Sequence, residues 1–253
     1  MHRRSAMFLL TSALATAGIA LPSITTSPSH GDTRITSVVV NSGRTVVLDV
    51  NQVTSFPVTV TATDDSGIRS VDPVGVWGAK YGILKVSRMR CEKLSAISSA
   101  CTGTATVDTS KHQVWNDEAG TWYVDAQANA QDGDRVRVGN IGGFSLKRSG
   151  RLHSYQVPRR AKAGSQASIQ GWLSRAWWDT GEYHGSPGDQ VRLMFRPDGS
   201  STWRTVSTEV SNDLGQVATT VRFTRSGWYQ WFFAGSKWTG GARSAARHVT
   251  VQK

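Results

Sequence analysis

The 253-residue sequence has two cysteines, few charged residues and no window of a dozen residues with a convincing helical period. Two cysteines exclude a four-cysteine zinc site and an iron–sulfur cluster held by thiolates, and they allow one internal disulfide at most. Glycine is about a tenth of the chain and shows no collagen-like or linker-like bias, so the composition is that of packed domains. After the first thirty residues, no stretch approaches the ~20 apolar residues that a transmembrane helix requires.

Acidic residues are also scarce, with 18 Asp and Glu against 29 Lys and Arg, and the deficit lies in the C-terminal half. Residues 32–146 contain 11 basic and 12 acidic side chains, whereas residues 147–253 contain 16 basic and 6 acidic ones, a net charge of +10. The same half holds seven of the ten tryptophans. Cations mixed with flat rings suit an anionic, ring-bearing polymer; alternatively, the arginines keep a secreted β protein soluble and the tryptophans pack its core.

The N-terminus has the pattern of an export signal. Three residues, His2 to Arg4, give a positive start, and the apolar stretch from Ala6 to Leu21 is followed by a segment rich in Pro, Ser and Thr. We therefore expect residues 1–31 to be a signal peptide and short leader, and the protein to be secreted. In an oxidising compartment Cys91 and Cys101 are expected to pair.

Beyond residue 31 the dominant period is two, which is typical of half-buried strands. Val58, Val60 and Ala62 alternate with threonines, and turn signals such as Ser186-Pro187-Gly188-Asp189 separate the strand-like runs at short intervals. Many short strands without intervening helices predict an all-β protein built of sandwiches or barrels.

A weak internal repeat divides the chain. A glycine turn leads into an aromatic strand at Ala119–Tyr123 and again at Arg225–Tyr229, and each is followed by one last strand. This is the place of the F strand in an immunoglobulin-like sandwich. We predict two tandem Ig-like β-sandwich domains, at 32–146 and 151–253, joined by a short linker at 147–150 that leaves some hinge freedom.

The segment Leu173–Gly188 is the candidate binding site, because it is too long for a hairpin turn and rich in aromatic and polar residues. In an extended chain one of the neighbours Trp177 and Trp178 faces inward and the other outward, where it could stack on a sugar or base. The alternative is that both cover the open end of the sandwich while Tyr183 hydrogen-bonds a loop. The binding candidates in the second domain are Arg175, Trp177, Trp178, Tyr183, Arg192, Arg196, Arg204 and Arg222.

Motifs for catalysis, metals and cofactors are weak or absent. The sequence has no His-Glu-x-x-His helix, Gly-x-Ser-x-Gly elbow or phosphate-binding glycine loop. Asp179 and Glu182 are the best carboxylate pair for glycoside hydrolysis, a weak signal on one loop. The turn aspartates at 64–65 and 132–134 could gather a cation, but hydrogen bonds to their own backbone explain them more simply. We therefore predict no catalytic residue, metal site or cofactor.

Short motifs resemble a known group of proteins. The second domain resembles the bacterial Ig-like modules of secreted actinobacterial proteins in Gly171-Trp172-Leu173, Trp177-Trp178-Asp179-Thr180-Gly181, Tyr183-His184-Gly185 and Gly227-Trp228-Tyr229. The first domain resembles a partner module of those proteins in Thr63–Ile68, the cysteine pair and Ala119–Trp122. The resemblance implies two Ig-like folds, and some of these proteins are labelled calcium-binding.

The expected function is extracellular contact without catalysis. The second domain would hold the protein on an anionic cell-wall or extracellular polymer, so that it is secreted and associated with the cell envelope. A purely structural module or a ligand of other surface proteins is the main alternative, and calcium binding or a glycan-degrading activity are the others.

Overall fold

A computed structural model describes residues 31–78 and 80–253 of the chain. Its strands form four sheets, two from residues 34–148 and two from residues 150–252, which we call the first and second domains. The predicted signal peptide lies outside the described residues, apart from Gly31. Within the described part of the chain, no helix is long and apolar enough to cross a membrane.

The first domain packs a four-stranded sheet against a five-stranded one. The four-stranded sheet has the order β1 (Arg34–Val40), β3 (Val53–Thr63), β7 (Ser98–Asp108) and β6 (Arg90–Lys93). The five-stranded sheet has the order β2 (Val46–Leu48), β9 (Arg135–Arg148), β8 (Gly120–Ala130), β4 (Ile68–Gly78) and β5 (Ile83–Lys85). Three 3₁₀ turns complete it: η1 (Asn41–Gly43), η2 (Thr109–Lys111) and η3 (Asn116–Glu118).

The second domain repeats this two-sheet plan. One sheet pairs β10 (Gly150–Tyr155) with β12 (Gln166–Trp177), whose other edge pairs with β16 (Gln216–Arg222) and β13 (Glu182–Gly185). The other has the order β11 (Arg160–Lys162), β19 (Arg247–Gln252), β17 (Gly227–Phe233), β14 (Gln190–Pro197) and β15 (Arg204–Val210), and the short β18 (Ala242–Arg243) also pairs with β17.

Alternation of apolar and polar residues explains the core, as the sequence predicts. Val58, Val60 and Ala62 of β3 are all fully buried, while the threonines between them face outward. The two aromatic strands of the repeat are β8 and β17; both are central in their sheets, and each buries one tryptophan, Trp122 or Trp231. The all-β, Ig-like sandwich fold is therefore confirmed.

The predicted disulfide is present between Cys91 and Cys101, which lie opposite each other on β6 and β7. Its loop of nine intervening residues is short, so the chain-entropy model gives it about 2.5 to 3 kcal/mol of stability. We expect Cys91→Ser to lower the free energy of unfolding by that amount in a chemical denaturation experiment without reductant. Equal stability of the variant and the parent protein would contradict this.

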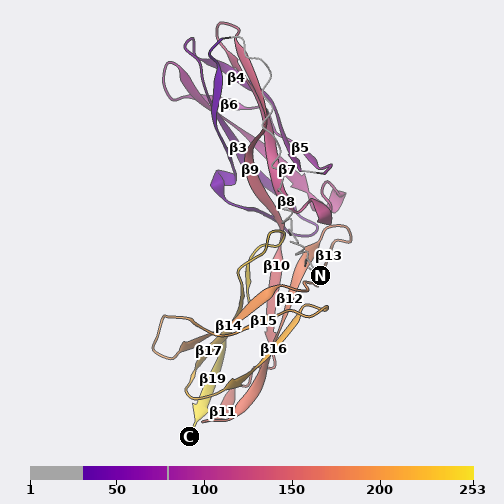
Figure 1. The fold of residues 1–253 in the computed structure, drawn as a ribbon, viewed down its shortest axis with the longest axis vertical. Coiled ribbons are helices and arrows are strands. Elements are labelled where there is room, and N and C mark those ends of the chain that lie inside the picture. The colour runs from indigo at the N-terminus through magenta and orange to yellow at the C-terminus, as the bar shows by residue number, and fades with distance from the viewer. Residues whose placement is uncertain (1–30, 79) are drawn as a thin grey trace, which may run out of the picture.

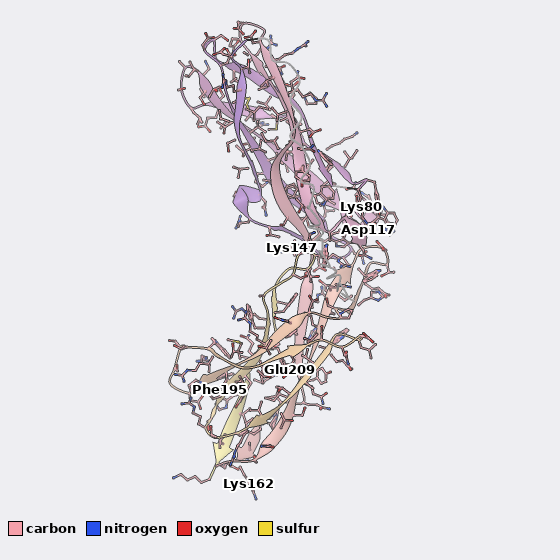
Figure 2. The ribbon with its side chains drawn as sticks, viewed as in Figure 1. Lys80, Asp117, Lys147, Lys162, Phe195 and Glu209 are labelled. Carbon is pink, nitrogen blue, oxygen red and sulfur yellow. A yellow bond between two sulfur atoms is a disulfide. The ribbon has the colours of Figure 1, made fainter. Side chains whose placement is uncertain are left out.

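The expected linker at 147–150 is not a free connection. Lys147 and Arg148 belong to β9, Gly150 begins β10, and Ser149 alone lies between them. The Arg148 amide donates to the Trp238 carbonyl (2.9 Å), and the Ser149 amide donates to the Leu48 carbonyl (2.8 Å). The connection is thus hydrogen-bonded to both domains, and Figure 2 shows Lys147 at the narrow waist where they meet.

The two domains also share a core. Trp178 of the second domain is fully buried in the apolar cluster of the first, together with Val46 and Leu48. Its indole Nε1 donates to the Leu48 carbonyl (3.3 Å), and its amide donates to Asn116 Oδ1 (2.8 Å). These contacts do not support the expected hinge freedom between the domains. The domains lie end to end with a packed junction (Figure 1).

Candidate functional site

The segment Leu173–Gly188 is a hairpin and not the long loop that the sequence suggests. Strand β12 continues to Trp177, and Ser174 to Trp177 pair with Gly185 to Glu182 of β13, so the turn is only residues 178–181. Gly181 closes this turn with a φ of +72°, a conformation that favours glycine. The loop prediction failed because β12 is 12 residues long and carries its aromatic residues in the strand itself.

The prediction that neighbouring tryptophans point to opposite sides holds. Trp178 enters the domain junction, so it cannot stack on a ligand, and its assignment as a binding residue is wrong. Trp177 is only partly buried and lines a groove at the end of the β10–β12–β13 sheet. The register places Trp177 and Arg175 on one face of β12 and Trp172 on the other, so the groove is lined from both faces. Tyr183 lines the same groove, and its hydroxyl donates to Asp49 Oδ1 of the first domain (2.7 Å). This is the kind of contact that the packing alternative predicts, in which Tyr183 hydrogen-bonds a loop.

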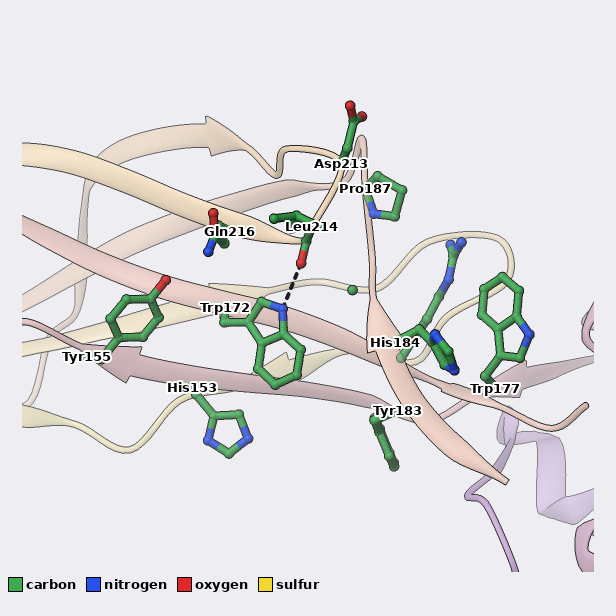
Figure 3. Close-up of a pocket in the computed structure, with 12 residues that line it drawn as sticks. His153, Tyr155, Trp172, Trp177, Tyr183, His184, Pro187, Asp213, Leu214 and Gln216 are labelled. Atoms are coloured by element: carbon green, nitrogen blue, oxygen red, sulfur yellow. Dashed lines mark hydrogen bonds between the residues drawn. The ribbon is translucent and has the colours of Figure 1, made fainter. Parts of the chain in front are cut away.

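The groove has a volume of about 760 Å³ and is walled mainly by aromatic rings (Figure 3). Trp172 is held by its indole Nε1, which donates to the Leu214 carbonyl (2.7 Å), and the His153 ring lies stacked beside it at a centroid distance of 6.2 Å. The rings of Trp177 and His184 lie next to each other, with their centroids 5.1 Å apart. The lining residues are His153, Tyr155, Trp172, Arg175, Trp177, Tyr183, His184, Gly185, Pro187, Asp213, Leu214 and Gln216.

Two arginines meet at Trp177. The guanidinium carbons of Arg148 and Arg175 lie 5.5 and 5.6 Å from the centre of the Trp177 ring. Burial lowers the pKa of Arg148 to about 10, with a further contribution from the positive charge of Arg175, and burial likewise lowers the pKa of Arg175. Sequence patterns do not single out Arg148, because it lies in the predicted linker.

The remaining arginine candidates lie elsewhere. Arg192 and Arg196 lie on β14 on the outer side of the five-stranded sheet, opposite Phe232 and Trp228 of β17. Arg204 is opposite the buried Phe195, so the register places it on the other face from Arg196. Arg222 ends β16 in the other sheet. The arginine and aromatic candidates therefore do not form one site.

Alternation along β17 creates a second surface, which we call the basic face. Its arginines lie over aromatic rings: Arg192 is 5.0 Å and Arg243 4.4 Å from the centre of Phe232, and Arg196 is 5.3 Å from Trp203 and 5.7 Å from Trp228. Trp228 also lines an adjoining cleft of about 750 Å³ beside β19. We define the basic face by the arginines that lie over these rings together with those that line the cleft: Arg159, Arg160, Arg192, Arg196, Arg243 and Arg247.

The basic face is not neutralised by the protein. Among the described residues, Arg151 is the only Lys or Arg of the second domain whose side chain forms an ion pair, and it pairs with Asp49 of the first domain (3.3 Å). The carboxylate of Asp198, near this surface, lies 3.0 Å from His248 and pairs with no arginine. The sequence candidates do not include Arg159, Arg160, Arg243 and Arg247. Only the folded chain brings three of these arginines to the cleft beside Trp228 and places Arg243 over the Phe232 ring.

The carboxylate pair considered for glycoside hydrolysis, Asp179 and Glu182, has neighbours that suggest structural roles. Asp179 accepts hydrogen bonds from the amide and side-chain nitrogens of Asn116 (2.9 and 2.6 Å), across the domain junction, and Glu182 is exposed beside His184. Asp179 is therefore positioned to hold the domains together.

Turn aspartates gather at the far end of the first domain. Oxygens of Asp64, Asp65 and Asp132 lie within 4.8 Å of one another, and a second group joins Asp32 and Asp134 to Asp64. Burial raises the pKa of Asp64, but hydrogen bonds from Ser66 and Thr33 outweigh it and leave the pKa below its usual value. The Ser66 amide donates to Asp64 and the Asp134 amide to Asp132, so turn hydrogen bonds account for these positions without an ion.

Comparisons with known protein families and with curated proteins found no match. Among solved structures, the chain is similar to fibronectin(III)-like modules of Clostridium thermocellum CbhA (13% identity, TM-score 0.34, covering 85% of this chain and 93% of that one). It is also similar to the D00-D0 domain of intimin (10% identity, TM-score 0.30, covering 85% of this chain and 100% of that one). A third similar structure is a superoxide reductase from Ignicoccus hospitalis (14% identity, TM-score 0.30, covering 42% of this chain and 82% of that one). These values are too low to assign a function, so the function must be inferred from the geometry of the sites.

Proposed function

We propose that the protein is a secreted, non-enzymatic binding module that attaches to an anionic polymer of the cell envelope or extracellular matrix through the basic face of its second domain. The observation that carries the proposal is the group of six arginines on the five-stranded sheet and along the cleft beside it, none of which pairs with a carboxylate of the described residues. Uncompensated positive charge on a rigid sheet raises the local concentration of a polyanion and speeds its association.

The geometry of the arginines favours oxyanions as the bound groups. A guanidinium that lies over an aromatic ring is held in place by the cation–π attraction, while the N–H donors at its edge remain free to point outward. Arg192 and Arg243 share the Phe232 ring in this way. Arg196 lies near both Trp203 and Trp228, and its Nη1 donates to the Ser200 carbonyl (2.9 Å), which holds the guanidinium in place. Paired N–H groups match the two oxygens of a phosphate, sulfate or carboxylate, so the rings orient the arginines and do not themselves need to stack on the ligand.

The disulfide supports an extracellular location. Structural disulfides form and persist outside the cytoplasm, and the Cys91–Cys101 bond joins paired strands of the first domain. Together with the export-signal pattern of the N-terminal sequence, it supports cell-wall polyanions and acidic extracellular polymers as the proposed ligands.

The proposal is tested by binding of the full chain to purified cell walls, teichoic acid, heparin and DNA across a salt series. We expect binding at low salt that weakens steeply as salt rises, because each arginine contact with the polymer releases a counter-ion. Failure to bind any of the four in dilute buffer, or binding that salt leaves unchanged, would overturn the proposal.

The packed junction favours a second candidate, in which the protein is a rigid spacer or a ligand of other surface proteins. Trp178, Asn116 and Asp179 fix the end-to-end arrangement of the domains, as a spacer requires. The same salt series separates the candidates, since contacts dominated by apolar surface do not weaken steeply with salt.

A further inference from the structure

Arg148 and Arg175 are two cations close to one indole, and no described residue supplies a counter-ion to either. Arg148 is 6% exposed, and Arg175 is half-buried on β12. Among the described residues neither side chain forms an ion pair, and the Nε atom of each is buried without a hydrogen-bond partner. Buried polar groups are nearly always hydrogen-bonded, and buried charges are nearly always paired, so this arrangement needs an explanation.

The nearby carboxylates do not supply the missing partner. Asp179 and Asp189 are close enough to favour the charged form of Arg148, but they do not contact it. Asp179 accepts both of its hydrogen bonds from Asn116, and Asp189 Oδ2 accepts one from the Ser186 hydroxyl (2.6 Å). A bound anion would remove the repulsion between the two guanidinium groups and satisfy their free donors.

The groove leads directly to this pair of charges. Arg175 and Trp177 line one end of it, and Figure 3 shows His184, Trp172 and Tyr155 following one another away from Trp177. Gln216 and Asp213 add polar groups to its lining. Aromatic rings with a few polar groups, beside a charge that needs a partner, are the features of a site for a ring-shaped ligand bearing an acid group.

We propose that the groove between β10, β12, β13 and β16 binds an acidic oligosaccharide, with a carboxylate on Arg175 and a sugar ring against Trp177, which lies on the same face of β12. Arg148 adds a second positive charge from the domain junction. The arginines of this site lie near the domain junction, whereas the basic face lies on the other sheet and along the cleft that adjoins the groove at Tyr155. The site needs only a short ligand because its charge is confined to one end of the groove.

Isothermal titration of the full chain with trigalacturonate at about 0.15 M salt tests the proposal, because this ionic strength screens long-range attraction to the basic face. The fully methyl-esterified trisaccharide, which has the same rings without the charges, is the matched ligand control. We expect the ester to bind at least about tenfold more weakly than the acid, since a charge-assisted hydrogen bond is lost. Equal affinity for acid and ester, or no binding of the acid at millimolar concentration, would overturn the proposal.

Variants locate the site. Arg175→Gln and Trp177→Ala should each weaken trigalacturonate binding by about tenfold or more, and neither side chain lies in the buried cores. Arg204→Gln removes the same charge from the opposite sheet and should leave the affinity unchanged. Wild-type affinity in Arg175→Gln, or an equal loss in Arg204→Gln, would show that the groove is not the site.

Discussion

Replacing Trp178 with alanine is expected to lower the free energy of unfolding by about 3 to 5 kcal/mol, because a fully buried tryptophan leaves both lost apolar contact and a cavity. The cavity would lie in the shared core at the junction, beside Val46 and Leu48. The substitution also removes the hydrogen bond to the Leu48 carbonyl. Chemical denaturation followed by circular dichroism measures this change.

The same variant should alter how the protein unfolds. We expect the wild type to unfold in one transition, since the two domains share a core, and the Trp178→Ala variant to show two, as the domains lose their coupling. Trp238→Ala is the matched control, because that side chain is 50% exposed in the same domain, and it should cost less than about 1 kcal/mol. Equal effects of the two substitutions, or one unchanged transition in both, would mean that Trp178 does not couple the domains.

The second large effect is expected in polyanion binding. Changing Arg192, Arg196 and Arg243 together to glutamine should weaken binding to heparin or teichoic acid by about a hundredfold or more at low salt, since three charge-assisted contacts are lost. The slope of log affinity against log salt should become shallower by about 2 to 3, as each lost contact no longer releases a counter-ion. Surface plasmon resonance over a salt series measures both quantities.

The control for this variant changes the same number of charges elsewhere. Arg34, Arg44 and Arg69 are exposed in the first domain, and their joint change to glutamine lowers the net charge equally. At about 0.15 M salt we expect this control to retain affinity within about twofold, because attraction beyond the Debye length of ~8 Å is then largely screened. A similar loss in both variants would show that binding follows net charge and not the basic face.

Much of the fold follows from local patterns in the sequence. Alternation identifies the buried residues of β3, and the glycine-aromatic repeat identifies β8 and β17, because a strand with one buried face must place every second side chain in the core. The disulfide follows from the export signal and the cysteine count. These features depend on neighbours in the chain, so the sequence is sufficient to predict them.

The sites are less predictable because they depend on contacts between distant segments. Trp178 looks like a surface residue of a polar loop, and only the position of the first domain shows that it is buried. Arg148 looks like part of a linker, yet it meets Arg175 at Trp177. Arg204 and Arg196 both look like strand residues of one basic surface, but the pairing register places them on opposite faces.

Arginine-selective labelling of the full chain with and without heparin, read by mass spectrometry, tests most directly whether a polyanion binds the basic face. We expect protection of Arg192, Arg196, Arg243 and Arg247, and unchanged labelling of Arg69 in the first domain. Protection that is uniform over both domains, or confined to the first, would contradict it.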